Sequence, residues 1–358
     1  MTALWVAVEV SVMSVARVVD DWFRERTHAS LTASRATLLA LVAGFGAASL
    51  AGVSAPLWAQ AVVYLVGMVA LNLPHGGYEH VANLRRREWG VRGRYVALYL
   101  AGIAGFTGLY LLAPVAGLGL ALAVAVAKAG LGDLHVMDTT TGTPHLPGRA
   151  SRLLAAAVRG GAVMLVPIVF WPDVFHSFSS LMIDMVEPGG LAPYAALFDV
   201  TRPLIAVGYA LALLAHVAGG YLRGGGRAWL VDAVESLLLV AYFAVVPVVV
   251  AVGLYFPLWY SARQTARAAL VERPADGPDL LGADPERAAL IAWGVAVAGA
   301  LLTGGVLAAL YLAFPEPLPG GLLVGAVAFW SVAISIIALP HVVVGSLLDD
   351  EQGIWYVP

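Results

Sequence analysis

A proline–histidine pair at the end of an apolar segment is the first place where this sequence could do chemistry. Residues 71–80 read LNLPHGGYEH, which places His75 and Glu79 where an apolar run ends. An ionisable side chain at a membrane edge is costly unless it has a partner or a function. Pro74 fixes its own φ and restricts the preceding residue, so it can kink a helix and turn His75 inward. An interfacial histidine at a helix end is the alternative interpretation.

Similar polar groups recur near the ends of later apolar segments. His135 lies in GDLHVMD, with Asp133 and Asp138 close by. Tyr260 and Gln264 are four residues apart, so they share one face of a helix. Imidazole binds iron, zinc and copper, and the absence of cysteine excludes thiolate ligands. A histidine set without thiolates is typical of a non-haem iron site.

Other ionisable residues could contribute to such a site or have a structural role. His216 lies in an apolar segment, where a histidine usually makes a hydrogen bond between helices. His341, in LPHVVVG, repeats the Leu-Pro-His pattern of 73–75. Glu235 lies within an apolar run and is therefore a functional candidate. Three histidines are expected to be solvated in loops: His28, His145 and His176.

The composition predicts an all-α, polytopic integral membrane protein. Of the 358 residues, 60% are hydrophobic and 12% are charged, whereas soluble domains carry roughly 25% charged residues. A net charge of −3 without a basic tail gives no indication of a nucleic-acid partner. We therefore expect a multi-pass protein of the cell membrane that is surrounded by lipid.

The apolar segments predict about ten transmembrane helices, because a span needs about 20 mainly apolar residues. The candidates are 36–53, 57–73, 94–113, 115–135, 152–171, 201–222, two within 228–268, 289–313 and 321–344. Short loops rich in arginine stay in the cytoplasm. Arg263 and Arg267 face the cytoplasm like the other loop arginines only if 228–268 forms two short spans, hinged near Pro247.

The chain is expected to form a single transmembrane domain over 36–348. Residues 1–35 precede it as an interfacial or partial-span segment, and 349–358 follow it as a short cytoplasmic tail. The first segment lacks the basic start and the small-residue cleavage site of a signal peptide. The segment 172–200 is expected to lie along the outer membrane surface, and 270–288 to form a polar cytoplasmic loop.

At these residues the chain resembles the Brp/Blh-type β-carotene 15,15′-dioxygenases of archaea and bacteria. The resemblance covers most of the chain from about residue 60 to the end. The first family motif, Pro-His-Gly followed by an acidic residue and a histidine, is matched by Pro74, His75, Gly76, Glu79 and His80. The second, a histidine with an acidic residue shortly after it, is matched by His135 and Asp138. The third, an acidic residue early in the long apolar stretch, is matched by Glu235.

The fourth family motif is Tyr-Phe-x-x-Trp-His-Ser-x-Arg-His, and this chain has YFPLWYSARQ at 255–264. Five motif positions are matched, by Tyr255, Phe256, Trp259, Ser261 and Arg263. Both histidines of the motif are replaced, by Tyr260 and Gln264. The fold that the resemblance implies is unaffected by this departure, but the metal site that it implies is changed.

The resemblance implies oxidative central cleavage of β-carotene, or a related carotenoid, to retinal by membrane-embedded non-haem Fe²⁺ and O₂. It implies metal ligands at His75, His135, Tyr260 and Gln264, the last two at the positions of the replaced histidines. Tyrosinate can bind ferric iron and glutamine is a weak ligand, but neither reproduces imidazole for ferrous iron. His216 or His341 is then an alternative ligand.

Two other functions follow from the same residues. The first is a catalytically degenerate paralogue that binds carotenoid or retinal or assists opsin maturation, and an opsin is a candidate partner in either case. The second is a transporter, which is less favoured because the polar groups lie near one membrane face rather than at mid-depth. Tyr260 and Gln264 are the residues that distinguish the enzyme from the paralogue.

Overall fold

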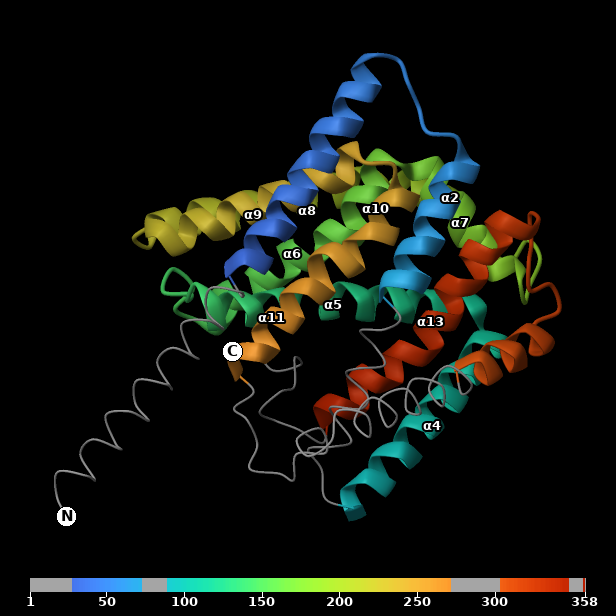
Figure 1. Cartoon of the computed structure of the whole chain (residues 1–358). Coiled ribbons are helices and arrows are strands. Elements are labelled where there is room, and N and C mark those ends of the chain that lie inside the picture. Colours follow the sequence, from blue (N-terminus) through green and yellow to red (C-terminus); the bar gives the residue numbers. More distant parts are fainter. Residues whose placement is uncertain (1–27, 73–88, 272–302, 348–356, 358) are drawn as a thin grey trace, which may run out of the picture.

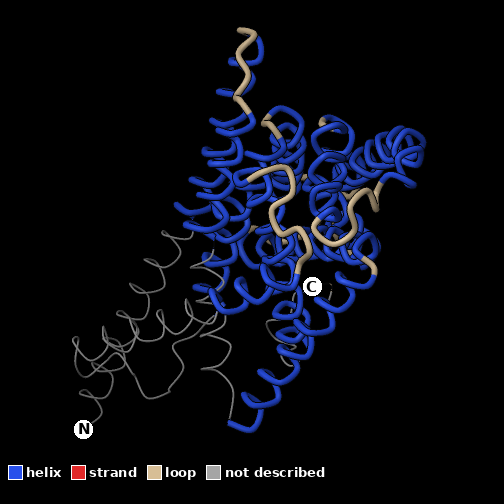
Figure 2. The backbone as a smooth tube through the Cα atoms, turned by 90° about the vertical axis from the view of Figure 1, so that its right-hand side faces the viewer, coloured by secondary structure: helices blue, strands red, loops and turns tan. Residues whose placement is uncertain are grey.

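The computed structural model describes residues 28–72, 89–271, 303–347 and 357, and these residues form helices and loops without a strand (Figures 1 and 2). Within this part of the chain, seven helices are long and apolar enough to cross a membrane. They are His28–Leu50, Gly93–Leu112, Pro114–Thr140, Arg149–Phe170, Ala192–Leu222, Gly226–Val245 and Leu322–Pro340. The chain is an all-α polytopic membrane protein, as its composition predicts.

The count of seven differs from the ten spans that the sequence predicts. The described part of the predicted span 57–73 is a shorter apolar helix, in which the α-helix α2 (Leu57–Leu65) passes into a π-helix, η1 (Val66–Asn72). Only Thr303–Ala313 of the predicted span 289–313 lies in the described residues.

The long apolar stretch 228–268 is divided in two, as predicted. The helix α9 (Gly226–Val245) ends before Pro247, and α10 (Val248–Tyr255) begins directly after it. Val246 is extended, with ψ of 131°, because the residue before a proline is disfavoured in helical geometry. The second half continues from α10 through the π-helix η3 (Phe256–Ser261) into α11 (Ala262–Val271). The π-helix η3 therefore interrupts the regular α-helix in the second half of this stretch.

The remaining described helices complete the helical bundle (Figure 1). They are α4 (Trp89–Leu112), α5 (Pro114–Thr140), α6 (Arg149–Phe170), α7 (Pro172–Asp184), the 3₁₀-helix η2 (Ala192–Tyr194), α8 (Ala195–Leu222) and α13 (Leu322–Leu347). The expected surface segment 172–200 thus contains a helix, α7, and the beginning of α8. On α7, the ring of His176 packs edge-on against Phe198 at 4.8 Å, so this histidine is not in a solvated loop.

Glycines bring α5 and α6 into backbone contact. A Cβ atom at Gly130 would lie 1.9 Å from the carbonyl oxygen of Ala156, and one at Gly160 would lie 2.0 Å from that of Val126. Small residues at such positions let membrane helices approach closely. This contact places the C-terminal half of α5 directly against α6, and the polar residues described below lie there.

Candidate functional site

Three of the predicted metal ligands lie around one turn of α5. His135 is on the C-terminal half of this helix and only 3% exposed, and Gly132, three residues earlier, shares its face of the helix. A Cβ atom at Gly132 would lie 2.8 Å from Nε2 of Gln264, 2.9 Å from Cε2 of Tyr260 and 3.1 Å from the Tyr260 hydroxyl oxygen. The absence of a side chain at Gly132 therefore lets Tyr260 and Gln264 cover this turn. We call Gly132, His135, Tyr260 and Gln264 the α5 pocket.

The π-helix η3 sets the position of Tyr260. Pro257 has no backbone N–H, so the regular helical hydrogen bond to the carbonyl group of Gly253 cannot form. Single π-helical turns are frequent at functional sites. The wider turn precedes α11, and Gln264 follows Tyr260 by four residues across this junction. A proline that the sequence places inside the fourth family motif thus changes the helix geometry at the pocket.

A second π-helix, η1, packs against the same region. A Cβ atom at Gly67 would lie only 2.2 Å from the carbonyl oxygen of Gly253, so η1 and α10 touch through their backbones. The segment that follows η1 contains Pro74 and His75, which lie outside the described residues. The convergence of His75 with the α5 pocket therefore stays a prediction.

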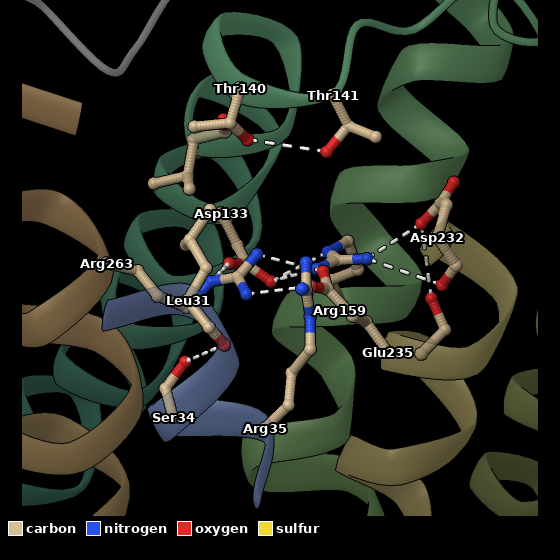
Figure 3. Close-up of polar contacts among 12 residues, drawn as sticks. Leu31, Ser34, Arg35, Asp133, Thr140, Thr141, Arg159, Asp232, Glu235 and Arg263 are labelled. Carbon is tan, nitrogen blue, oxygen red and sulfur yellow. Dashed lines mark hydrogen bonds and ion pairs between the residues drawn. The ribbon is translucent and has the colours of Figure 1, made fainter. Parts of the chain in front are cut away.

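A cluster of charged side chains is buried beside the pocket (Figure 3). Its members are less than 4% exposed, and we call them the buried ion network: Asp133, Arg159, Asp232, Glu235 and Arg263. They come from α5, α6, α9 and α11. Charged groups inside a membrane protein are tolerated when they pair with one another.

Arg263 connects α11 to α5 and α9. Its Nε donates to Oδ1 of Asp133 at 2.9 Å, and its two Nη atoms each donate to one carboxylate oxygen of Glu235 at 2.8 Å. Its guanidinium also stacks over the ring of Trp259, with Cζ 4.2 Å from the centroid. Arg263 and Trp259, which both match the fourth family motif, thus have a structural role. Since Arg263 directly precedes Gln264, its contacts fix the backbone that carries one side of the pocket.

Arg159 occupies the centre of the network. Its Nε donates to Oδ2 of Asp133 at 2.7 Å, and its Nη1 donates to Oδ1 of Asp232 at 2.7 Å. Its Nη2 also pairs with Glu235. Arg159 is not among the residues predicted from the sequence, although an isolated arginine in an apolar helix, opposite intramembrane carboxylates, is a signal for such a partner.

Glu235 is enclosed by arginines rather than left available for catalysis. Besides the two network arginines, Arg35 of the helix His28–Leu50 donates from Nε to its Oε1 at 2.7 Å. The Arg35 side chain is 32% exposed, so it links the network to the surface. The three network carboxylates are thus matched by three guanidinium groups, which leaves none of these carboxylates as an evident metal ligand.

Two histidines share one oxygen of Asp232. Nε2 of His145 lies 2.9 Å from Oδ2 of this carboxylate, and Nε2 of His216 lies 3.1 Å from it. The expectation that His145 is solvated is wrong: it is 2% exposed, because the loop after α5 folds back and Arg223 donates to its carbonyl oxygen at 3.2 Å. The interpretation of His216 as a contact between helices is confirmed.

Three further residues named from the sequence have different outcomes. Asp138 accepts hydrogen bonds from Thr143 and from Arg152, the latter at 3.2 Å. His28 is exposed, as predicted. His341 lies on α13 beside Pro340, but its side chain is outside the described part of the structure.

Sequence comparison identifies the family. The sequence model of the family described as Beta-carotene 15,15'-dioxygenase matches residues 66–349. The chain belongs to this family. It is 54% identical over 338 residues to a protein of Halobacterium salinarum named probable beta-carotene 15,15'-dioxygenase Brp, covering 92% of this chain and 94% of that protein. It is 35% identical over 316 residues to the probable beta-carotene 15,15'-dioxygenase Blh of the same species, covering 84% and 85%. No solved structure matches the chain.

Proposed function

We propose that the chain cleaves the central double bond of β-carotene, or of a related carotenoid, to give retinal. The observation that carries this proposal is the α5 pocket, because two residues of the fourth family motif cover the turn of α5 that holds the histidine of the second motif. Family membership supports the same reaction class. The carotenoid and O₂ would be the substrates, and each of two aldehyde products would receive one oxygen atom.

The residue types of the pocket fit an iron ion. Within the described chain, no three histidine or carboxylate side chains are grouped as a metal site would require. The donors available there are the imidazole of His135, the hydroxyl of Tyr260 and the amide of Gln264, and iron accepts nitrogen and oxygen donors. His75 would supply a second imidazole. Fe²⁺ bound by these four residues would provide the activation of O₂.

The surroundings of the pocket suit a polyene. The rings of Tyr255 and Phe256 are 5.3 Å apart, and those of Phe256 and Tyr260 are 6.2 Å apart, so aromatic rings continue from the pocket along η3. These rings would exclude water and lie against the apolar chain of the carotenoid. Because a multi-pass protein of the cell membrane is surrounded by lipid, the apolar substrate would enter from the lipid.

The proposal is tested by retinal formation from β-carotene in detergent with added Fe²⁺ and O₂. The wild type is expected to release retinal, and His135→Ala is expected to reduce the rate to background, because it removes the pocket's described imidazole. His176→Ala is the matched control, since this histidine lies on α7 against Phe198, and it should retain the wild-type rate. A folded wild type that forms no retinal, or an unchanged His135→Ala rate, would contradict the proposal.

A second candidate function is favoured by the two replaced motif histidines. A paralogue with a weakened metal site would bind carotenoid or retinal without cleaving it, or assist the maturation of an opsin. Such a protein would retain added β-carotene through purification, hold little iron and release no retinal. Binding measured together with product analysis therefore separates the two candidates.

A further inference from the structure

The chain has a single lysine, and it lies beside the α5 pocket. Lys128 is near the middle of α5, four residues before Gly132 and seven before His135, so these three residues share one face of the helix. Its Nζ lies 5.2 Å from the centroid of the Tyr260 ring. An ionisable residue inside a transmembrane helix is a candidate for function by default.

The choice of lysine at this position is informative. All other cationic side chains of the chain are arginines, and arginine is found more often than lysine over aromatic rings. A guanidinium would thus stack on Tyr260 equally well. A primary amine can also act as a nucleophile toward a carbonyl group, which a guanidinium cannot do under the same conditions.

We propose that Lys128 binds the aldehyde product as a reversible imine. This inference rests on the proposed function, because central cleavage of a carotenoid would release an aldehyde next to Lys128. The deprotonated Nζ would attack the carbonyl carbon, and a proton would move from nitrogen to the carbonyl oxygen to form a carbinolamine. Loss of water then breaks the carbon–oxygen bond and leaves a carbon–nitrogen double bond. No oxidant or reductant is needed, and hydrolysis reverses the reaction.

Tyr260 is placed to assist this reaction. Its ring faces Nζ of Lys128, and its hydroxyl oxygen would be 3.1 Å from a Cβ atom at Gly132, one turn further along α5. When Tyr260 binds no metal, its hydroxyl group would donate a proton to the leaving oxygen of the carbinolamine. The imine would hold a reactive apolar aldehyde at the protein until water, or the amine of an acceptor protein, releases it.

The experiment uses the full-length protein in detergent and all-trans retinal as the probe. Sodium borohydride reduces an imine to a stable amine, so mass spectrometry can locate the retinyl group. We expect one group per chain, on Lys128. In Lys128→Arg we expect at least tenfold less label, because the α-amino group is then the only primary amine left. Lys128→Met is the second variant, in case the arginine disturbs folding, and should lose the label equally.

A position control separates a built site from general reactivity of amines in a micelle. Leu120 is 45% exposed on the same helix, so Lys128→Arg combined with Leu120→Lys places an amine on an exposed face of α5. We expect this variant to be labelled at least tenfold less than the wild type. Equal labelling of position 120, or a wild type in which Lys128 stays unlabelled, would overturn the proposal. Since retinal is added directly, this result is independent of whether the protein cleaves carotene.

Discussion

The buried ion network and the α5 pocket lie next to each other on α5, but their chemistry differs. In the network, each carboxylate is held by at least one arginine, and Arg159 and Arg263 both bond to Asp133. In the α5 pocket, the phenol of Tyr260 and the amide of Gln264 lie beside Gly132, and the imidazole of His135 is three residues further along α5. The comparison indicates that the charged residues hold the helices together, and we propose that the imidazole, phenol and amide beside them carry the chemistry.

The two regions are mechanically connected. Asp133 precedes His135 by two residues, and Arg263 directly precedes Gln264, so the ion pair between Asp133 and Arg263 joins the two backbones that form the pocket. Breaking a buried ion pair costs about 3–5 kcal/mol, because it leaves a buried charge without a partner. Damage to the network is therefore expected to affect folding first, and damage to the pocket to affect function first.

The largest effect is expected for Arg159→Met. This change removes the hydrogen bonds of one guanidinium to Asp133, Asp232 and Glu235, and it should destabilise the protein by about 3–5 kcal/mol. Thermal unfolding in detergent measures the effect. Arg202→Met is the matched control, because Arg202 is exposed and, among the described residues, donates to the carbonyl oxygen of Val169 alone. Similar unfolding temperatures for the two variants would show that the network does not stabilise the fold.

A smaller and more local effect is expected for Gly132→Ala. The added methyl group would overlap Tyr260 and Gln264, and overpacking of this kind costs about 1–3 kcal/mol. Retinal formation should fall by at least tenfold while the helical content stays constant. Gly119→Ala, on the same helix with open space around its Cβ position, should retain full activity. An unchanged rate in Gly132→Ala would show that Tyr260 and Gln264 are not functionally coupled to this turn.

The smallest effect is expected for Arg152→Ala. Arg152 pairs with Asp138, which is 36% exposed, and also donates to the carbonyl oxygen of Leu146 at 3.0 Å. An exposed ion pair contributes at most about 1 kcal/mol. Stability should change by less than that amount, and iron content and retinal formation should stay at the wild-type level. A loss of iron in Asp138→Ala, without a loss in Arg152→Ala, would mean that Asp138 supports the pocket after all.

The sequence was sufficient to predict the helical class, most span positions and the break at Pro247, because these follow from apolar length and from the local constraints of proline. The two π-helices were not predicted, since a π turn depends on which backbone groups lose their partners when η1 packs on α10.

The candidate site was predictable only in part. The pairing of Tyr260 with Gln264 followed from helical spacing, and the importance of His135 followed from its acidic neighbours. The residues that pair with these acidic neighbours could not be predicted from local spacing. Asp133 is bound by Arg159 only because glycines let α5 and α6 touch. The burial of His145 depends on a loop that folds back toward α8, which no local pattern indicates.

The iron content of purified protein tests the central claim most directly, namely that Tyr260 and Gln264 face His135 in one metal-binding pocket. The variant that combines Tyr260→His with Gln264→His would add two imidazoles one turn apart on the face that covers Gly132. We predict that its iron content and its rate of retinal formation both rise above those of the wild type. The control Tyr221→His, at an exposed position, should leave both unchanged. A folded double variant with no gain in iron would contradict the claim.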